Sequence, residues 1–240
     1  METKGMIALI TGASRGIGES IAIRLAAMGM QIVITGRDAD KLEMLKDHIQ
    51  KIAPKPHIIV ADISAPDTPG RLIGETIQMF GGIDLLVNNA GYAISKSLEE
   101  TDYHEWDHSM AVNARAPFFI CKEAIPYLRE SACATIINIS SVVGRLGYVH
   151  QAAYAASKHA LMGFSKVLAK EVQPLGIRVH TIAPGGVATD MVKTMRADID
   201  ESQLIQPEEI ADIVEFFLRH RGNAMIDNID VRRANGTPFA

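Results

Sequence analysis

Short apolar runs alternate along the chain with longer stretches in which apolar residues recur every three or four positions. The runs IALI, IVI, HIIV and DLLV are almost uninterrupted, which is typical of parallel strands covered on both faces. Together with three later runs they predict seven strands, at Met6–Thr11, Gln31–Thr35, His57–Asp62, Ile83–Asn88, Thr135–Ser140, Ile177–Ala183 and Met225–Val231.

The stretches between these runs have the period of amphipathic helices. The first carries apolar residues three or four apart and ends at Gly29, and the last begins at Pro207, a residue suited to the first turn of a helix. Strands and helices alternate from end to end without a repeat or a linker. The pattern therefore predicts one α/β domain over residues 1–240, a doubly wound Rossmann-type fold with helices on both faces of a central parallel sheet of about seven strands.

Composition narrows the class of protein. A hydrophobic content of 48% with 22% charged residues excludes a disordered chain. No apolar run approaches the ~18 residues of a membrane span. With 24 basic against 28 acidic residues, the chain has no large positive electrostatic field that would attract nucleic acid. The N-terminus has no secretory signal, and Cys121 and Cys133 lie apart without a metal or redox spacing. We expect a cytoplasmic protein with a small-molecule partner, and neither nucleic acid nor membrane.

A glycine-rich segment, Thr11–Gly18, follows the first predicted strand and opens the first predicted helix. Gly12, Gly16 and Gly18 would let the backbone turn tightly and approach a pyrophosphate, which the free N–H groups of the helix N-terminus bind. A purely structural turn is the alternative, but the strand–turn–helix context favours a dinucleotide site.

The spacing of these glycines is GxxxGxG, not the GxGxxG of two-domain dehydrogenases. Together with later motifs it resembles the short-chain dehydrogenase/reductase family, in particular the 3-oxoacyl-carrier-protein reductases. The resemblance covers about Met6 to Val192 and is carried by Thr11–Gly18, Asn88–Gly91, Asn113, Ile139–Ser141, Tyr154–Lys158 and Pro184–Gly185 with Thr189.

Tyr154 and Lys158 are four residues apart in a predicted helix and so share one face. A free phenol has a pKa of ~10, and a neighbouring ammonium would bring it closer to neutrality. Ser141 ends a predicted strand and could orient a substrate oxygen, although by position alone Ser140 is an equal candidate. The resemblance assigns that role to Ser141, makes Tyr154 the general acid/base, and implies that Asn113 holds a water linking Lys158 to solvent.

The resemblance also implies the cofactor contacts. Asp62 and the loop after the fourth strand would border the adenosine, and the loop after the sixth strand would border the nicotinamide. The expected set is Gly12, Ser14, Arg15, Gly16, Ile17, Gly18, Arg37, Asp62, Asn89, Ala90, Gly91, Tyr154, Lys158, Pro184, Gly185, Val187 and Thr189.

The end of the second strand bears on the choice of cofactor. An acidic residue there would bind the ribose 2′-OH of NAD, but this chain has Gly36 in that place. Arg37 and Arg15 could clamp a 2′-phosphate. Asp38 follows directly, and a shift of one residue in register would weaken this reasoning. We predict NADP(H) rather than NAD(H).

These residues predict NADPH-dependent reduction of a ketone or 3-oxoacyl group. An NAD-dependent dehydrogenase of a sugar, steroid or other secondary alcohol is the alternative, and a nucleotide-sensing regulator without turnover is a third reading. Residues 186–206 are long enough for a substrate lid. A partly apolar substrate pocket is suggested by Tyr92, Leu146, Tyr148 and Met191. His150 either borders this pocket or is an ordinary loop residue.

Two features of the sequence depart from the usual pattern of the family. His180 stands where the family usually has Asn, and the usual Gly-Gly after the last strand is missing, which leaves the packing of the C-terminal tail open.

The helix Ala152–Glu171 is apolar nearly all round, so we expect one face on the sheet and the other against a second subunit of a homodimer or homotetramer. His104 and His108 have metal-pair spacing but no acidic helper, and no metal site is expected.

Overall fold

The computed structural model describes residues 3–195 and 200–238, and its centre is a seven-stranded parallel sheet in the order β3-β2-β1-β4-β5-β6-β7. This is the predicted doubly wound α/β fold. The strands are β1 (Ile7–Thr11), β2 (Gln31–Gly36), β3 (His57–Val60), β4 (Leu85–Asn88), β5 (Thr135–Ile139), β6 (Arg178–Pro184) and β7 (Asn228–Val231). The helices are α1 (Gly16–Ala27), α2 (Ala39–Ile49), α3 (Thr68–Phe80), α4 (Tyr103–Met110), α5 (Ala116–Leu128), α6 (Ala152–Val172), α7 (Asp190–Met195) and α8 (Pro207–Arg219).

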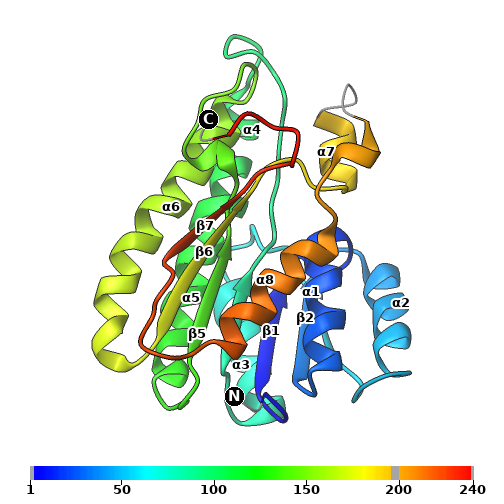
Figure 1. Ribbon diagram of the computed structural model, residues 1–240, viewed down its shortest axis with the longest axis vertical. Helices are drawn as coiled ribbons and strands as arrows, with labels where there is room; N and C mark the ends of the chain where they lie inside the picture. The colour runs from blue at the N-terminus through cyan, green and yellow to red at the C-terminus, as the bar shows by residue number, and fades with distance from the viewer. Residues whose placement is uncertain (1–2, 196–199, 239–240) are drawn as a thin grey trace.

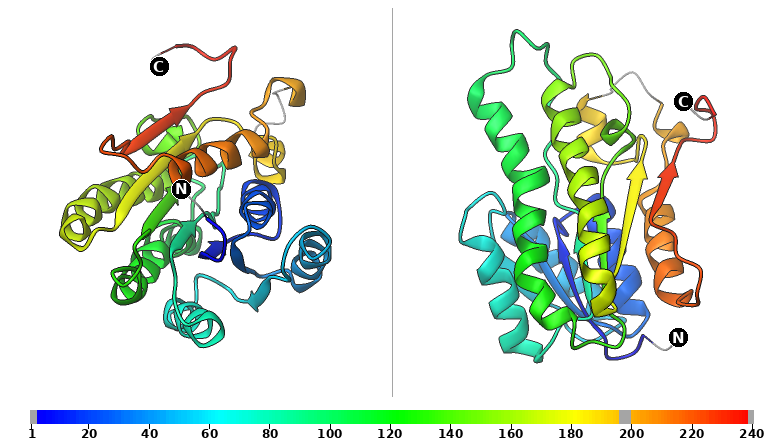
Figure 2. Two further views of the ribbon diagram at one scale, coloured as in Figure 1. Left: turned by 60° about the horizontal axis from the view of Figure 1, so that its bottom comes forward. Right: turned by 90° about the vertical axis from the view of Figure 1, so that its left-hand side faces the viewer.

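Side chains from β1 to β6 pack into two separate cores, one on each face of the sheet, whereas β7 contributes Ile229 and Val231 to the first of them. In β1, Ala8 and Ile10 point into the core beneath α1, α2 and α8, whereas Leu9 points into the core beneath α3, α5 and α6. Figure 2 shows these two helical layers with the sheet between them. Because both faces of the strands are buried, their sequences are uninterrupted apolar runs rather than alternating ones.

The strand order reverses between β1 and β4. The chain winds from β1 outward to β3, returns to place β4 beside β1, and continues to β7. At such a switch point the loops leaving neighbouring strands diverge and open a crevice at their carboxyl ends. In Figure 1 this edge is at the top of the molecule, where α7 and the C-terminal tail also lie.

Three predicted strand ends were wrong by two or three residues. β3 stops at Val60 because Asp62 begins a turn in which its carboxylate accepts hydrogen bonds from the N–H and hydroxyl of Ser64. β4 starts at Leu85, because the Asp84 carboxylate accepts from the Ile7 N–H. β7 starts at Asn228, and the three residues before it are exposed.

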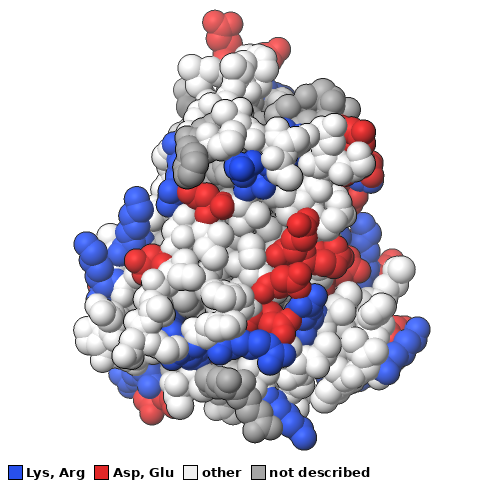
Figure 3. Space-filling view, viewed as in Figure 1, with Lys and Arg blue, Asp and Glu red and all other residues white. Residues whose placement is uncertain are grey.

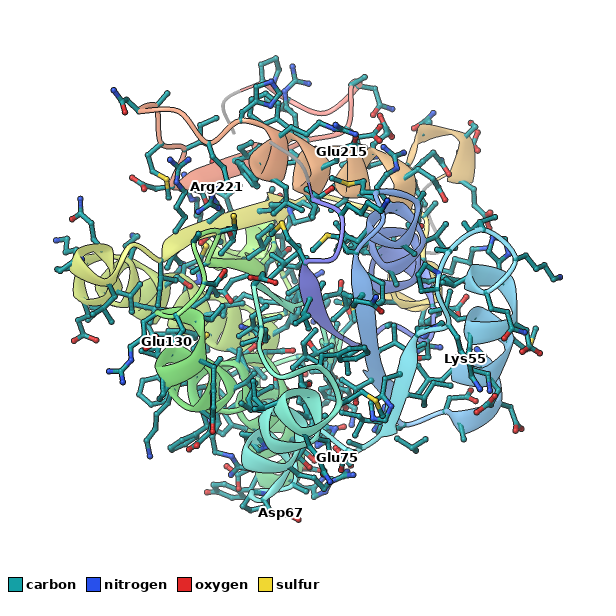
Figure 4. All side chains as sticks on the ribbon, turned by 90° about the horizontal axis from the view of Figure 1, so that it is seen from below. Lys55, Asp67, Glu75, Glu130, Glu215 and Arg221 are labelled. Carbon is teal, nitrogen blue, oxygen red and sulfur yellow. The ribbon has the colours of Figure 1, made fainter. Side chains whose placement is uncertain are left out.

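Charged side chains join α1 to α8, and most of the others are on the surface, with Lys158 a buried exception. Arg24 of α1 pairs with both Asp212 and Glu215 of α8, and the hydrogen bond that Arg24 donates to Glu215 raises the pKa of Arg24. Figure 3 shows acidic side chains gathered on the face where α1 and α8 lie. In Figure 4 the labelled charged residues lie around the periphery of the protein. In the described ranges no helix is long and apolar enough to cross a membrane.

Candidate active site

A cavity of about 1360 Å³ opens at the carboxyl ends of the strands. Its wall contains nearly all the residues expected from the sequence: Gly12, Ser14, Arg15, Gly16, Ile17, Arg37, Asp62, Asn89, Ala90, Gly91, Ser141, Tyr154, Lys158, Pro184, Gly185, Val187 and Thr189. Gly18 and Asn113 are not part of the wall. The apolar set Tyr92, Leu146, Tyr148 and Met191 lines it, whereas His150 does not.

The glycine-rich loop is fastened to the loop that follows β4. The Thr11 hydroxyl accepts hydrogen bonds from the N–H groups of Asn89 and Ala90, each at 3.0 Å. Gly12 has φ +65°, and a Cβ there would lie 2.7 Å from the Ala90 Cα. Gly12 is therefore required both by its left-handed backbone and by the approach of the neighbouring loop.

Gly18 supports the cradle from behind. A Cβ at Gly18 would collide with the carbonyl oxygen of Gly12 and the side-chain nitrogen of Asn89, so this position packs helix α1 on the loop rather than touching the cavity. Helix α1 begins at Gly16, and the residue at its N-cap, Arg15, makes no side-chain hydrogen bond to the first turn. The first N–H groups of α1 are thus left to bind an anion such as a pyrophosphate.

The end of β2 has the register that the sequence predicted. β2 ends at Gly36, and the Asp38 carboxylate caps α2 by accepting from the Lys41 N–H at 3.1 Å. Asp38 therefore lies outside the cavity wall, whereas Arg37 is part of it. Arg15, the second predicted clamp residue, pairs across the cavity with Asp190 at 3.0 Å.

Lys158 and Tyr154 are both buried at the inner end of the cavity. The Lys158 ammonium donates to the carbonyl oxygen of Ile139 at 2.9 Å, and burial lowers its pKa to about 8. Burial raises the pKa of Tyr154, and a hydrogen bond with Ser141 only partly opposes this. We expected Lys158 to bring the phenol toward ionisation. Burial is instead the dominant influence on this pKa and Lys158 does not offset it, so Tyr154 is a neutral phenol near pH 7.

Both serines at the end of β5 reach the cavity, but they differ in their partners. The Ser141 hydroxyl contacts the Val143 N–H and the Pro184 carbonyl, and it is the serine that hydrogen-bonds Tyr154. The Ser140 hydroxyl is buried and has no hydrogen-bond partner within residues 3–195 and 200–238. The contact with Tyr154 is consistent with the role that the family resemblance gives to Ser141.

Asn113 lies in a turn of π-helix, Ala111–Arg115, between α4 and α5. Its amide accepts from the Tyr92 N–H at 2.8 Å and donates to the Tyr92 carbonyl at 2.7 Å and the Ser157 hydroxyl at 2.9 Å. These bonds join the loop after β4 to α6 one turn from Tyr154. The side chain is fully engaged in positioning, and the expected water relay stays a prediction.

Sequence reasoning missed Gln151 and the C-terminal tail. The buried Oε1 of Gln151 lines the cavity but has no hydrogen-bond partner in the described parts of the chain. It follows His150, whose φ of +65° is unusual for a residue other than glycine. After β7, Arg232, Arg233 and Gly236–Pro238 also reach the wall. No motif marks these residues, and only the position of Gln151 three residues before Tyr154 gave a signal.

Backbone hydrogen bonds join the two ends of the predicted lid, residues 186–206. The Ile205 N–H donates to the Gly186 carbonyl at 3.0 Å, and the Ala188 N–H donates to the Ile205 carbonyl at 2.8 Å. Between these points α7 contributes Met191 and Met195 to the cavity wall, while residues 196–199 of the predicted lid lie outside the described residues. Closure of this segment over a substrate stays a prediction.

The two histidines of α4 contact each other and the cavity wall. The rings of His104 and His108 stack with centroids 6.1 Å apart, and His108 meets the Tyr92 ring edge-on at 4.6 Å. In the described ranges no cluster of three or more His, Cys, Asp or Glu side chains is arranged to hold a metal ion.

Comparison with known proteins places this site in a family. The family model described as short chain dehydrogenase matches residues 6–200. A 3-oxoacyl-(acyl-carrier-protein) reductase of Aquifex aeolicus is 32% identical, over 90% of this chain and 91% of that protein. A glucose 1-dehydrogenase of Gluconobacter oxydans is 36% identical, over 88% and 84%.

Solved structures agree with this assignment. The crystal structure of a metagenomic short-chain oxidoreductase in complex with NADP superposes with a TM-score of 0.86 at 31% identity, covering 98% of this chain and 100% of that one. The chain therefore belongs to the short-chain dehydrogenase family and is an NAD(P)-dependent oxidoreductase acting on CH–OH or C=O groups.

Proposed function

We propose that this protein reduces the carbonyl group of a small molecule to an alcohol, using NADPH, with Tyr154 as the general acid. The observation that carries the proposal is that the buried Ser141, Tyr154 and Lys158 line the same cavity as the exposed Arg37. The nucleotide-sensing alternative requires none of the three buried side chains.

The residues of the cavity fit a phosphorylated dinucleotide. The uncapped start of α1 offers N–H groups to the pyrophosphate, and Gly16 at that start has a left-handed φ of +60° and no room for a Cβ, which would lie 2.9 Å from the Thr189 Cγ2. Arg37 would hold the 2′-phosphate, because its guanidinium lies on the wall while Asp38 is occupied by capping α2. Thr189, whose methyl group packs against Gly16, ties the nicotinamide side of the cavity to the phosphate loop.

When bound, the nicotinamide supplies the hydride that the carbonyl carbon accepts. Ser141 holds the carbonyl oxygen, and the Tyr154 hydroxyl gives its proton to that oxygen as the negative charge develops. A raised pKa suits this role, because Tyr154 starts as a neutral proton donor. Lys158 stabilises the phenolate left behind, since its pKa of about 8 keeps most of it charged near neutrality.

Relatives point to more than one direction of reaction. The similarity to a 3-oxoacyl reductase and to an NADP complex supports reduction. The similarity to a glucose 1-dehydrogenase supports oxidation of a secondary alcohol as a second candidate, which would use the same side chains in reverse.

Cofactor binding to the wild type and to Arg37→Gln tests the proposal. NADPH should bind the wild type about tenfold or more tightly than NADH, and Arg37→Gln should remove most of that preference by weakening NADPH alone. Arg129→Gln is the matched control, since Arg129 is exposed and pairs with Glu130. Tyr154→Phe should keep NADPH binding but lose turnover on a carbonyl panel. Equal affinities in the wild type, or an active Tyr154→Phe enzyme, would overturn the proposal.

A further inference from the structure

Among the residues that the structure describes, seven basic side chains line the cavity, and most of them are already engaged. Arg15 pairs with Asp190, Arg145 pairs with Asp230 at 2.8 Å, and Lys193 pairs with Glu201 at 3.0 Å. Lys158 donates to the Ile139 carbonyl. Arg232 donates to the carbonyl oxygens of Arg233, Ala234 and Gly236. Within the described ranges this leaves the guanidiniums of Arg37 and Arg233 without a hydrogen bond or an ion pair, although Arg37 interacts with the charge of Asp62.

The two unpaired guanidiniums lie in different parts of the cavity. Arg37 follows β2, on the adenosine side, where the proposed function gives it the 2′-phosphate. Arg233 follows β7, which pairs with β6 and meets it where the Gly185 N–H donates to the Val231 carbonyl at 2.7 Å. Its Cδ lies 3.7 Å from where a Cβ of Gly186 would be, so its stem packs beside the loop expected to border the nicotinamide.

The tail that carries Arg233 has a fixed shape. The three bonds from Arg232 and a bond from the Gly236 N–H to the Arg233 carbonyl at 2.9 Å close the tail into a turn. Asn235 then joins this turn to Gln203, beyond α7, at 2.8 Å. Asp230, the acidic residue closest to Arg233 in the sequence, accepts from both Arg145 and Asn228. The half-buried Arg233 is thus held in place, and no carboxylate of residues 3–195 or 200–238 forms an ion pair with it.

We propose that Arg233 is a specificity-determining residue that binds an anionic group, a carboxylate or a phosphate, on the carbonyl substrate. This rests on the proposed function, which places the reacting carbonyl between Ser141 and Tyr154. A planar guanidinium offers paired N–H donors that match either anion, and partial burial strengthens the attraction. The protein would then reduce oxo acids or oxo phosphates in preference to their neutral analogues.

The test compares charged and neutral ligands of the NADP⁺-loaded enzyme, which cannot reduce them, by calorimetry. Three pairs vary the distance from carbonyl to carboxylate: pyruvate, acetoacetate and levulinate, each against its methyl ester. Dihydroxyacetone phosphate against dihydroxyacetone separates phosphate from carboxylate. In at least one pair the wild type should bind the anion about tenfold more tightly, and Arg233→Gln should remove that preference without changing the affinity for the neutral partner.

Two further variants make the outcome specific. Arg233→Lys should keep part of the preference, since it retains the charge and shows that the tail tolerates substitution. Arg37→Gln should weaken NADP⁺ and leave the preference intact once the cofactor saturates. If Arg233 only packs on Gly186, Arg233→Gln would weaken acid and ester alike. That result, or no preference in any wild-type pair, overturns the inference, while reduction of the neutral esters by NADPH would still uphold the proposed function.

Discussion

The buried ammonium of Lys158 lowers the stability of the folded protein. Its ammonium is almost fully buried, and its hydrogen bond goes to a neutral carbonyl rather than a carboxylate. A buried cation without a counter-charge destabilises the folded state, which is why its pKa falls to about 8 from an ordinary 10.5. The charge of Lys158 is thus present in the candidate site at a cost to the stability of the folded protein.

Replacing this charge should stabilise the protein in a pH-dependent way. Because the pKa of Lys158 is lower in the folded state, the unfolded chain binds the extra proton between about pH 8 and 10.5. Wild-type stability should therefore rise across that window, by about 3 kcal/mol at most. Lys158→Met should be inactive yet more stable near pH 7, and its advantage should shrink toward pH 10.5.

Urea unfolding of both proteins at pH 7, 9 and 10 measures this difference. Lys158→Met also leaves the Ile139 carbonyl without its donor, which costs about 1 kcal/mol at every pH and does not alter the trend. A difference in stability that is the same at all three values would contradict the argument.

Individual residues also show the limits of the sequence. Tyr154, Lys158 and Ser141 could be predicted because they lie in motifs with fixed spacing. The direction of the Tyr154 pKa could not, since it depends on how deeply the fold buries the ring. The same holds for the buried Oε1 of Gln151, which has no hydrogen-bond partner among the described residues, and for the left-handed backbone of His150 before it, since no local pattern marks either feature.

Among the elements, β6 is fastened to the segment before β7 by His180. The ring stacks on Phe217 of α8 with centroids 4.1 Å apart, and its Nδ1 lies 2.7 Å from the Ile226 carbonyl. Burial lowers the pKa of His180, and the nearby Arg178 and Arg221 lower it further, against the effects of the Ile226 carbonyl and Asp227. His180 is therefore neutral in the folded protein near pH 7.

Acid should loosen this junction. Since the pKa of His180 is lowered on folding, the unfolded chain takes up the proton first as the pH falls below about 6.5, and stability is lost there. Wild type should lose up to about 1.4 kcal/mol per pH unit more than His180→Asn between pH 6.5 and 5. Thermal unfolding across that range checks this, and parallel curves for the two proteins would count against it.

The ion pair between Arg15 and Asp190 links the phosphate loop to the start of α7. A bound 2′-phosphate would compete with Asp190 for the Arg15 guanidinium. Asp190→Asn should therefore tighten NADPH by up to about fivefold, the range of an exposed pair, and leave NADH unchanged. Fluorescence titration with both cofactors measures this, and the argument fails if NADH binding improves as much as NADPH binding.

For the whole molecule, an apolar surface on α5 and α6 bears on assembly. Phe118, Phe119 and Val167 are each at least two-fifths exposed, and a shallow groove lies between the helices beside Phe164. The sequence predicted that α6 packs on a second subunit, and exposed aromatic residues on the adjoining α5 extend the apolar area.

We expect a homodimer or homotetramer through this surface at micromolar concentration. Phe118→Asp combined with Val167→Asp should give monomers, because two charges would be buried at the interface. Sedimentation velocity of the wild type and the double variant decides this, and a wild type that sediments as a monomer would refute it. Leu98→Asp, at another exposed apolar position, is the matched control and should not change the sedimentation coefficient.

At this scale the fold could be predicted well because local signals agree with it: apolar runs mark strands covered on both faces, and their alternation with helical stretches marks a doubly wound sheet. Contacts between distant segments could not be predicted. The bond from Asn235 to Gln203, and the approach of Arg233 to Gly186, depend on the pairing of β7 with β6 and on a turn that no motif announces.

The tail also has a practical consequence. Because Gly236–Pro238 form part of the cavity wall, a purification handle appended to the carboxyl end would extend from the rim of the active site and crowd its entrance. Thr3 precedes β1, at the opposite edge of the sheet (Figure 1). An amino-terminal handle therefore keeps the entrance clear, and it is the arrangement in which substrate screening of this enzyme should begin.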